Sequence, residues 1–247
     1  GSEKSGKSHV IAAAARAITA PGSRQLGFES SAGGRIVYLD FEQDRSDFES
    51  LILRSGIDAD RVSAYHLTGL MPNEARAALH AIAENEQGLV AILLDGYADL
   101  VSDPNDQSEA NSFVAELMSL AERKQIAILG ILHLNPGSEE KSRGHLGSQL
   151  GRKCQTVFSI KTLKDGTRIL YTAKARKRPV LESEGICFVW SDSARGFVEM
   201  QETPRDIRAA EQRSEFEQTL RKIQDLTGML AWRNAELCEA IQQVEHV

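Results

Sequence analysis

Eight residues at the start of the chain, GSEKSGKS, fit the pattern G-x-x-x-x-G-K-[ST] and run directly into an alanine-rich helical stretch. A glycine at each end of such a loop allows a tight turn, so the loop N–H groups and the helix N-terminus converge on phosphate groups. Lys7 would contact the β and γ phosphoryl oxygens, and Ser8 would bind Mg²⁺. The pattern predicts a site for ATP and Mg²⁺; the alternative is a chance loop rich in glycine, serine and lysine. The candidate nucleotide-binding residues are Gly1, Ser2, Glu3, Lys4, Ser5, Gly6, Lys7, Ser8 and His9.

An apolar segment, VAILLD, ends at Asp95. In α/β sheets the ligand-binding groups lie at the carboxyl ends of the strands, and a carboxylate placed there can hold the water shell of Mg²⁺. Ser8 and Asp95 are therefore the candidate metal ligands, partly through water. The alternative, an aspartate that only caps a turn before Gly96, is weaker once a phosphate-binding loop is present.

Two further apolar segments end next to residues that ATP hydrolysis could use. Glu42, in YLDFEQD, follows one of them and is the candidate base that orients and polarises water. It would otherwise be a solvated loop carboxylate beside Asp40 and Asp44. His133 follows IAILGIL, where it could contact the γ-phosphate and report its loss, although a lone histidine at a strand end is more often structural.

Helical and strand-like patterns alternate from residue 6 to residue 132, which predicts an α/β fold with a mainly parallel sheet and helices on both faces. Beyond that point a turn at 164–166 between two alternating runs predicts a β-hairpin within an antiparallel extension. The expected helices cover residues 6–20, 47–54, 73–85, 108–124, 143–153, 206–226 and 234–244. The expected strands cover residues 35–41, 62–67, 89–95, 126–132, 156–163, 167–174, 186–190 and 195–200.

Composition excludes several classes of protein. Of 247 residues, 41% are apolar and 26% charged, which is the balance of a globular chain and not of a disordered or fibrous one. The apolar runs are too short to cross a bilayer and no leader opens the chain, so we expect a cytoplasmic protein without a membrane partner. Three cysteines without metal-binding spacing favour reduced thiols.

The order and spacing of these motifs resemble the RecA-like ATPases, and within them the RepA-type hexameric helicases and related ATPases of mobile elements. GSEKSGKS is similar to the Walker A motif of that family, VAILLDG to its Walker B motif, and YLDFE to the segment that bears its catalytic glutamate. GILHLN is similar to the strand whose end residue senses γ-phosphate, and DGYADLVSDPND, HLNPG and RGHLGSQL point to the RepA-like branch. The resemblance implies a RecA-like P-loop core, ATP hydrolysis, assembly into a homo-oligomeric ring, possible as a hexamer, and action on single-stranded or duplex DNA.

The resemblance also bears on domain limits. We expect an ATPase domain over residues 1–203 and a helical segment over residues 204–247, because the composition changes to charged helix after Pro204. In this fold a central strand precedes the P-loop, so we expect residues upstream of Gly1. The last residues resemble the start of a helix-turn-helix module.

A basic pair, Lys174 and Arg176, resembles the Lys-x-Arg pair that RecA-like rings direct across the subunit interface onto a neighbour's ATP. Alternation along a strand would place both side chains on one face, where they could neutralise charge on the leaving phosphoryl group. Arg152 is the rival for this role. A basic edge strand that only keeps the chain soluble is the alternative.

Net charge is −6, yet residues 143–178 hold ten lysines and arginines against one acid, Asp165. Arg143, Arg152 and Lys153 flank the loop that faces the central channel in the family, so they are the candidate contacts to a nucleic-acid backbone. A solvated basic edge is the alternative, and few aromatic residues lie there for base stacking.

Three functions therefore compete. The first is an ATPase coupled to DNA, such as a helicase, a helicase loader or a mobile-element replication protein. The second is a regulatory module that binds ATP to oligomerise and uses hydrolysis as a timer. The third, a small-molecule phosphotransferase, would want a lid and an acceptor pocket, and the sequence has a signature of neither.

Overall fold

The computed structural model describes residues 6–133 and 144–227, with side chains given up to residue 222. The chain divides into two compact units, Gly1–Gln201 and Glu202–Val247. Within the described residues the second unit is a single helix, α6 (Pro204–Thr227). A capping box begins it: the Thr203 N–H donates to Asp206 Oδ2 at 2.8 Å, and the Thr203 hydroxyl accepts from the Asp206 N–H at 3.3 Å.

A four-stranded parallel sheet in the order β4-β3-β5-β6 forms the centre of the first unit. Its strands are β3 (Arg35–Asp40), β4 (Val62–His66), β5 (Leu89–Asp95) and β6 (Ala127–Gly130). The register places Asp40 beside His66 on one neighbouring strand and beside Asp95 on the other. The polar residues that end these strands therefore meet at one edge of the sheet.

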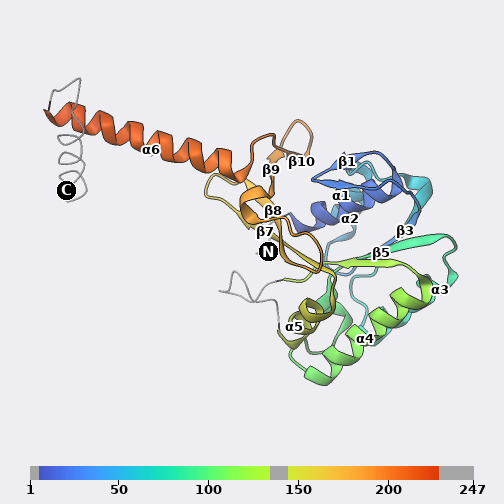
Figure 1. The fold of residues 1–247 in the computed structure, drawn as a ribbon. Coiled ribbons are helices and arrows are strands. Elements are labelled where there is room, and N and C mark those ends of the chain that lie inside the picture. The colour runs from blue at the N-terminus through green and yellow to red at the C-terminus, as the bar shows by residue number, and fades with distance from the viewer. Residues whose placement is uncertain (1–5, 134–143, 228–247) are drawn as a thin grey trace. The chain divides into compact units, whose positions relative to one another are not determined.

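Successive side chains of β3 enter two different cores, as expected for a strand covered on both faces. Ile36 and Tyr38 pack with α1 and α2, whereas Val37 and Leu39 pack with α3, α4 and α5. Figure 1 shows α1 and α2 on one side of β3 and β5, and α3 and α4 on the other. The helices of this unit are α1 (Lys7–Thr19), α2 (Arg45–Arg54), η1 (Ala59–Arg61), α3 (Pro72–Asn85), η2 (Tyr97–Leu100), α4 (Gln107–Lys124), α5 (Gly144–Lys153) and η3 (Glu182–Glu184).

An antiparallel sheet in the order β10-β9-β8-β7 follows the parallel one in the chain. Its strands are β7 (Thr156–Thr162), β8 (Arg168–Ala175), β9 (Ile186–Ser191) and β10 (Gly196–Glu199). The expected hairpin is formed by β7 and β8, whose register pairs Thr162 with Arg168. The predicted fold class, α/β with a parallel sheet, helices on both faces and an antiparallel extension, is confirmed.

The alanines of α1 are explained by its position against both sheets. Ile11, Ala12 and Ala15 pack on the parallel sheet, and Val10 and Ala13 pack on Leu170 and Phe188 of the antiparallel sheet. Small side chains let the helix backbone approach both partners closely.

A short hairpin of β1 (Arg24–Gln25) and β2 (Phe28–Glu29) was not predicted, because two-residue arms are too short to show alternation. Its turn residues, Leu26 and Gly27, have φ of 47° and 75°. Leu26 is buried in the core that α1 shares with the antiparallel sheet. The positive φ of Gly27 is one that other residues rarely adopt, and a Cβ there would also displace the end of the Ile186 side chain, 2.1 Å away.

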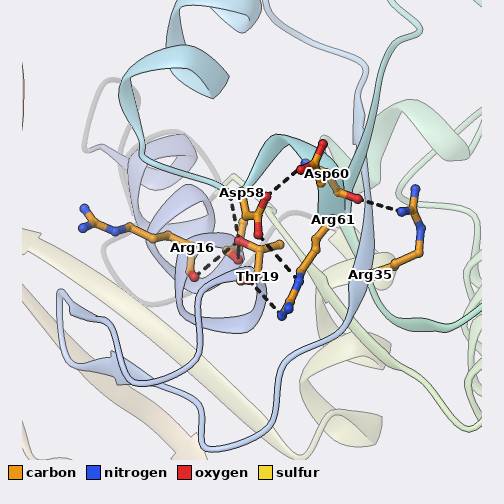
Figure 2. A network of polar contacts seen from close by, with 7 residues as sticks. Arg16, Thr19, Arg35, Asp58, Asp60 and Arg61 are labelled. Carbon is orange, nitrogen blue, oxygen red and sulfur yellow. Dashed lines mark hydrogen bonds and ion pairs between the residues drawn. The ribbon is translucent and has the colours of Figure 1, made fainter.

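A network of hydrogen bonds and ion pairs fixes the C-terminal end of α1 (Figure 2). The buried Thr19 hydroxyl donates to the Ala15 carbonyl at 3.0 Å and accepts from the Asp58 N–H at 3.2 Å. Arg61 donates to the Thr19 carbonyl at 3.3 Å and lies 3.6 Å from the Asp58 carboxylate. The segment that leads into β4 thereby holds α1 in place.

The structure differs from the sequence-based elements mainly at their ends. The strand expected over residues 126–132 has ladder pairing only over Ala127–Gly130, and the helix expected from residue 73 begins at Pro72. The helix expected at 234–244 lies outside the described residues. None of the helices in the described ranges is long and apolar enough to cross a membrane.

Candidate nucleotide site

The start of α1 has features that suit an anion. Gly6 is the N-cap, with φ 86°, and a Cβ on it would lie 2.9 Å from Phe197 Cε2, so only glycine fits. Among the described residues no side chain caps this end, and the first turn carries no acid. The N–H groups of a first helical turn and the helix dipole favour a phosphate at such an end. Of the predicted loop, Gly6, Lys7, Ser8 and His9 are described, and residues 1–5 lie outside the described residues.

Asp95 meets the start of α1 through a hydrogen bond with the Ser8 side chain. The aspartate ends β5 with 1% of its surface exposed. The two residues predicted to share Mg²⁺ therefore come together from a strand end and a helix start.

The charge on Asp95 is poorly compensated. Burial raises the pKa of Asp95 to about 7, against the hydrogen bond from Ser8, and the nearby carboxylates Asp40 and Glu42 raise it further. Burial also raises the pKa of Asp40, while hydrogen bonds from Gln43 act in the opposite sense. A cation bound beside these carboxylates would lower the free-energy cost of burying their negative charge.

Hydroxyl and carboxylate oxygens are ligands that suit Mg²⁺, so the residues present fit this ion. Within residues 6–133 and 144–227 no group of three or more His, Cys, Asp or Glu is arranged to hold a metal by itself. Mg²⁺ usually binds through one or two carboxylates together with nucleotide phosphates and water. When bound, it would neutralise phosphoryl charge beside Ser8 and Asp95.

Glu42 and His133 form a pair next to this site. The His133 Nε2 lies 2.8 Å from Glu42 Oε1 and 3.1 Å from Oε2, although the two residues follow different strands. Both side chains keep solvent access, with 45% of Glu42 and 26% of His133 exposed. A carboxylate in contact with a histidine at the carboxyl edge of the sheet can orient water, and the histidine can change its partner when a phosphate arrives or leaves.

Two further residues at this edge, Asp40 and Gln43, were not selected from the sequence. Asp40 is fully buried and ends β3 in register with Asp95. The Gln43 amide nitrogen donates to Asp40 Oδ2 at 2.6 Å and to Asp95 Oδ2 at 3.0 Å. Asp40 carried the same signal as Asp95, an aspartate at the end of an apolar strand, whereas nothing in the sequence marked Gln43.

An aromatic cluster lies over the first turn of α1. His9 packs edge-on to Trp190 and Phe197, with ring centroids 5.8 and 4.9 Å apart. Burial lowers the pKa of His9 to about 4, and Arg54 and Arg168 lower it further, so the ring is neutral. Trp190 is 42% exposed. An exposed indole beside a helix N-terminus offers a planar ring a surface for stacking, and the sequence did not predict this cluster.

Lys174 on β8 and Arg176, one residue beyond the end of β8, both contact the C-terminal end of α5. Lys174 Nζ donates to the Gly151 carbonyl at 2.5 Å, and Arg176 Nη2 donates to the Arg152 carbonyl at 3.2 Å. These bonds satisfy carbonyls at the C-terminus of α5 and complement its dipole. Arg152 and Lys153 are exposed next to them, so the structure brings four of the predicted basic residues into one patch. Arg143 lies outside the described residues.

A family model described as an AAA domain matches residues 1–139, a range that includes the start of α1, Glu42, Asp95 and His133. The match covers more than half of the chain, and the chain belongs to the AAA domain family. Such a domain indicates a P-loop ATPase that uses a nucleotide and usually Mg²⁺, and domains of this kind often oligomerise. No curated protein matches the chain.

Proposed function

We propose that this chain hydrolyses ATP with Mg²⁺ as a subunit of a homo-oligomeric ring, and that hydrolysis is coupled to action on DNA in the manner of the RepA-type ATPases. The roles follow the predicted site. Lys7 and the N–H groups at the start of α1 bind the phosphates, Ser8 and Asp95 hold Mg²⁺, Glu42 activates water, and His133 responds to the γ-phosphate.

The contact between Ser8 and Asp95, with the Glu42–His133 pair beside it, carries the proposal. Four chain segments distant in sequence contribute these side chains, and all four end or begin at one edge of the sheet. A phosphate-binding helix start, an Mg²⁺ ligand set and a general base are the parts that ATP hydrolysis needs.

Oligomer formation is supported by the basic pair at the end of β8, Lys174 and Arg176. Lys174 and Arg176 are exposed, and their present partners are carbonyl groups at a helix end. A neighbour's phosphoryl oxygens carry more negative charge than carbonyls, so both side chains could exchange one partner for the other at low cost. In that position they would neutralise charge on the leaving group in trans.

Action on DNA is supported by the charge of the same patch. Arg152 and Lys153 extend from α5 without acidic neighbours in sequence between residues 144 and 164. Together with Arg143 they suit contact with a phosphate backbone, which needs charge and no base readout.

Steady-state ATPase activity, measured with and without single-stranded and duplex DNA, tests this function when paired with mass determination with and without nucleotide. We expect Mg²⁺-dependent turnover that DNA stimulates and a nucleotide-dependent rise in mass. Lys7→Ala should abolish tight nucleotide binding. If that variant bound ATP as well as the parent, the phosphate site would be wrongly assigned.

A regulatory module that assembles on ATP is the second candidate, favoured by the present engagement of Lys174 and Arg176 with α5. It predicts the same rise in mass, slow turnover and no response to DNA. The DNA arm of the experiment separates the two.

A further inference from the structure

One side-chain amide joins the two buried aspartates at the carboxyl edge of the parallel sheet. Gln43 Nε2 donates to Asp40 Oδ2 at 2.6 Å and to Asp95 Oδ2 at 3.0 Å, so both of its protons are used on carboxylates of neighbouring strands. The same residue donates its backbone N–H to Asp40 Oδ1 at 2.9 Å. Asp40 therefore receives hydrogen bonds from Gln43 on both oxygens.

The backbone of Gln43 is itself anchored on a third strand. Its carbonyl accepts from the Thr68 hydroxyl at 3.0 Å and lies 2.9 Å from His66 Nε2. His66 ends β4, and Thr68 follows it by two residues. The turn after β3, which also carries Glu42, is thus tied to β4 on one side and to Asp95 on the other.

Glutamine is the residue type that this position requires. An amide supplies two N–H donors without charge, so it holds two carboxylates together and leaves their negative charge for a cation. A lysine would neutralise that charge and compete with Mg²⁺, and a glutamate would add a third negative group and donate nothing. A leucine of similar size would leave two buried carboxylates without these donors.

We propose that Gln43 is a positioning residue of the nucleotide site: its amide fixes the Asp95 carboxylate for Mg²⁺ while its backbone fixes the turn that presents Glu42. The inference rests on the proposed ATPase function and adds a residue to which that function assigns no role. Gln43 acts through Asp95 and Glu42 and does not touch the nucleotide. Groups that orient a metal ligand from behind typically change metal affinity or activity by about 10–100-fold when removed.

Gln43→Leu in the full chain tests this inference through three measurements: ATP affinity in EDTA, half-saturating Mg²⁺ at fixed ATP, and kcat. We expect the affinity in EDTA to stay within about twofold, half-saturating Mg²⁺ to rise about tenfold, and kcat to fall about 10–100-fold. A general loss of folding would lower all binding alike and would not raise the Mg²⁺ requirement selectively.

Gln149→Leu is the matched control, because Gln149 is also half-buried and its amide bonds one side chain, Asn111, on α4. It should leave the Mg²⁺ requirement and kcat unchanged. Thr68→Val is the milder second variant: it removes one donor to the Gln43 carbonyl, keeps the amide, and should lower kcat several-fold with a smaller change in the Mg²⁺ requirement.

Unchanged half-saturating Mg²⁺ and kcat in Gln43→Leu would overturn the inference and leave the ATPase function standing. An equal loss in Gln43→Leu and Gln149→Leu would also overturn it. If the parent chain neither bound nor hydrolysed Mg²⁺·ATP, the proposed function would fail first and this inference with it.

Discussion

The two ends of α1 carry polar clusters of opposite character. At the C-terminal end opposite charges and hydrogen-bond partners meet, as Figure 2 shows for Thr19, Asp58 and Arg61. At the N-terminal end, burial and then the nearby carboxylates of Asp40 and Glu42 raise the pKa of Asp95 to about 7.

The contrast separates interactions that stabilise the fold from groups that the fold positions for a ligand. A paired network stabilises the native state whether or not a ligand is present. Buried like charges destabilise it until a cation arrives, and the position of a phosphate-binding helix start beside them indicates which cation and which partner to expect. Substitutions at the two ends should therefore change the free energy of unfolding with different signs as well as by different amounts.

The largest effect is expected at Glu42. Glu42→Gln keeps the size of the side chain but removes the basic oxygen, so turnover should fall about 10²–10⁴-fold while ATP affinity changes little. Steady-state hydrolysis and equilibrium nucleotide binding measure the two quantities separately. Glu49→Gln is the matched control, since Glu49 is an exposed carboxylate on α2 that pairs with Arg45. Unchanged turnover in Glu42→Gln would show that another group is the general base.

A second effect concerns positive charge supplied to the N-terminal end of α1 by a neighbouring subunit. Arg176→Ala should leave ATP binding by the isolated subunit intact and lower hydrolysis by the oligomer at least about 10²-fold, somewhat less than for an arginine finger in other ATPases. Mixing it with Lys7→Ala should restore part of the activity, because a mixed interface then combines an intact phosphate site with an intact Arg176.

Arg152→Ala, measured alongside, distinguishes the rival residue. Full activity of Arg176→Ala under conditions where the parent is oligomeric would contradict the role of Arg176 in trans and favour Arg152 for it.

The third effect should have opposite signs for function and stability. Asp95→Asn should weaken the Mg²⁺ dependence of ATP binding, yet stabilise the protein measured in EDTA without nucleotide. A pKa near 7 instead of 3.8 corresponds to about 4 kcal/mol at most, so a gain of about 1–4 kcal/mol is expected above pH 7.

The sign follows from proton binding. Between pH 4 and 7 the native Asp95 binds its proton more tightly than the unfolded chain does, so the unfolding free energy of the parent falls as pH rises through that window. Asp95→Asn should lack this part of the fall. Denaturant titrations across the window measure it, and a variant less stable than the parent at pH 8 would contradict the account.

The sequence predicted the site best where a single residue ends a strong pattern. Asp95 and Glu42 follow long apolar runs, and the fold places both at the predicted edge. Gln43 could not be found this way, because its contacts depend on the register that sets Asp40 beside Asp95, and a one-dimensional pattern carries no register. Trp190 and Phe197 were missed for a related reason: their strands are predicted, but not that β9 and β10 pack over His9.

The smallest effect is expected at the C-terminal end of α1. It tests the part of the comparison that concerns the network that stabilises the fold. Thr19→Val keeps the branched shape but removes the hydroxyl, which leaves the Asp58 N–H without its acceptor in a largely buried position. An unsatisfied buried donor costs about 1–3 kcal/mol, so the unfolding free energy should fall by that amount in the presence and absence of nucleotide alike. Thr19→Ser is the matched control, because it keeps the hydroxyl and loses one methyl group. Turnover and the Mg²⁺ requirement of the folded Thr19→Val protein should equal those of the parent, since the network in Figure 2 lies at the opposite end of α1 from the nucleotide site. A change in the Mg²⁺ requirement would mean that α1 transmits strain between its ends, and the two clusters would then have to be treated as one.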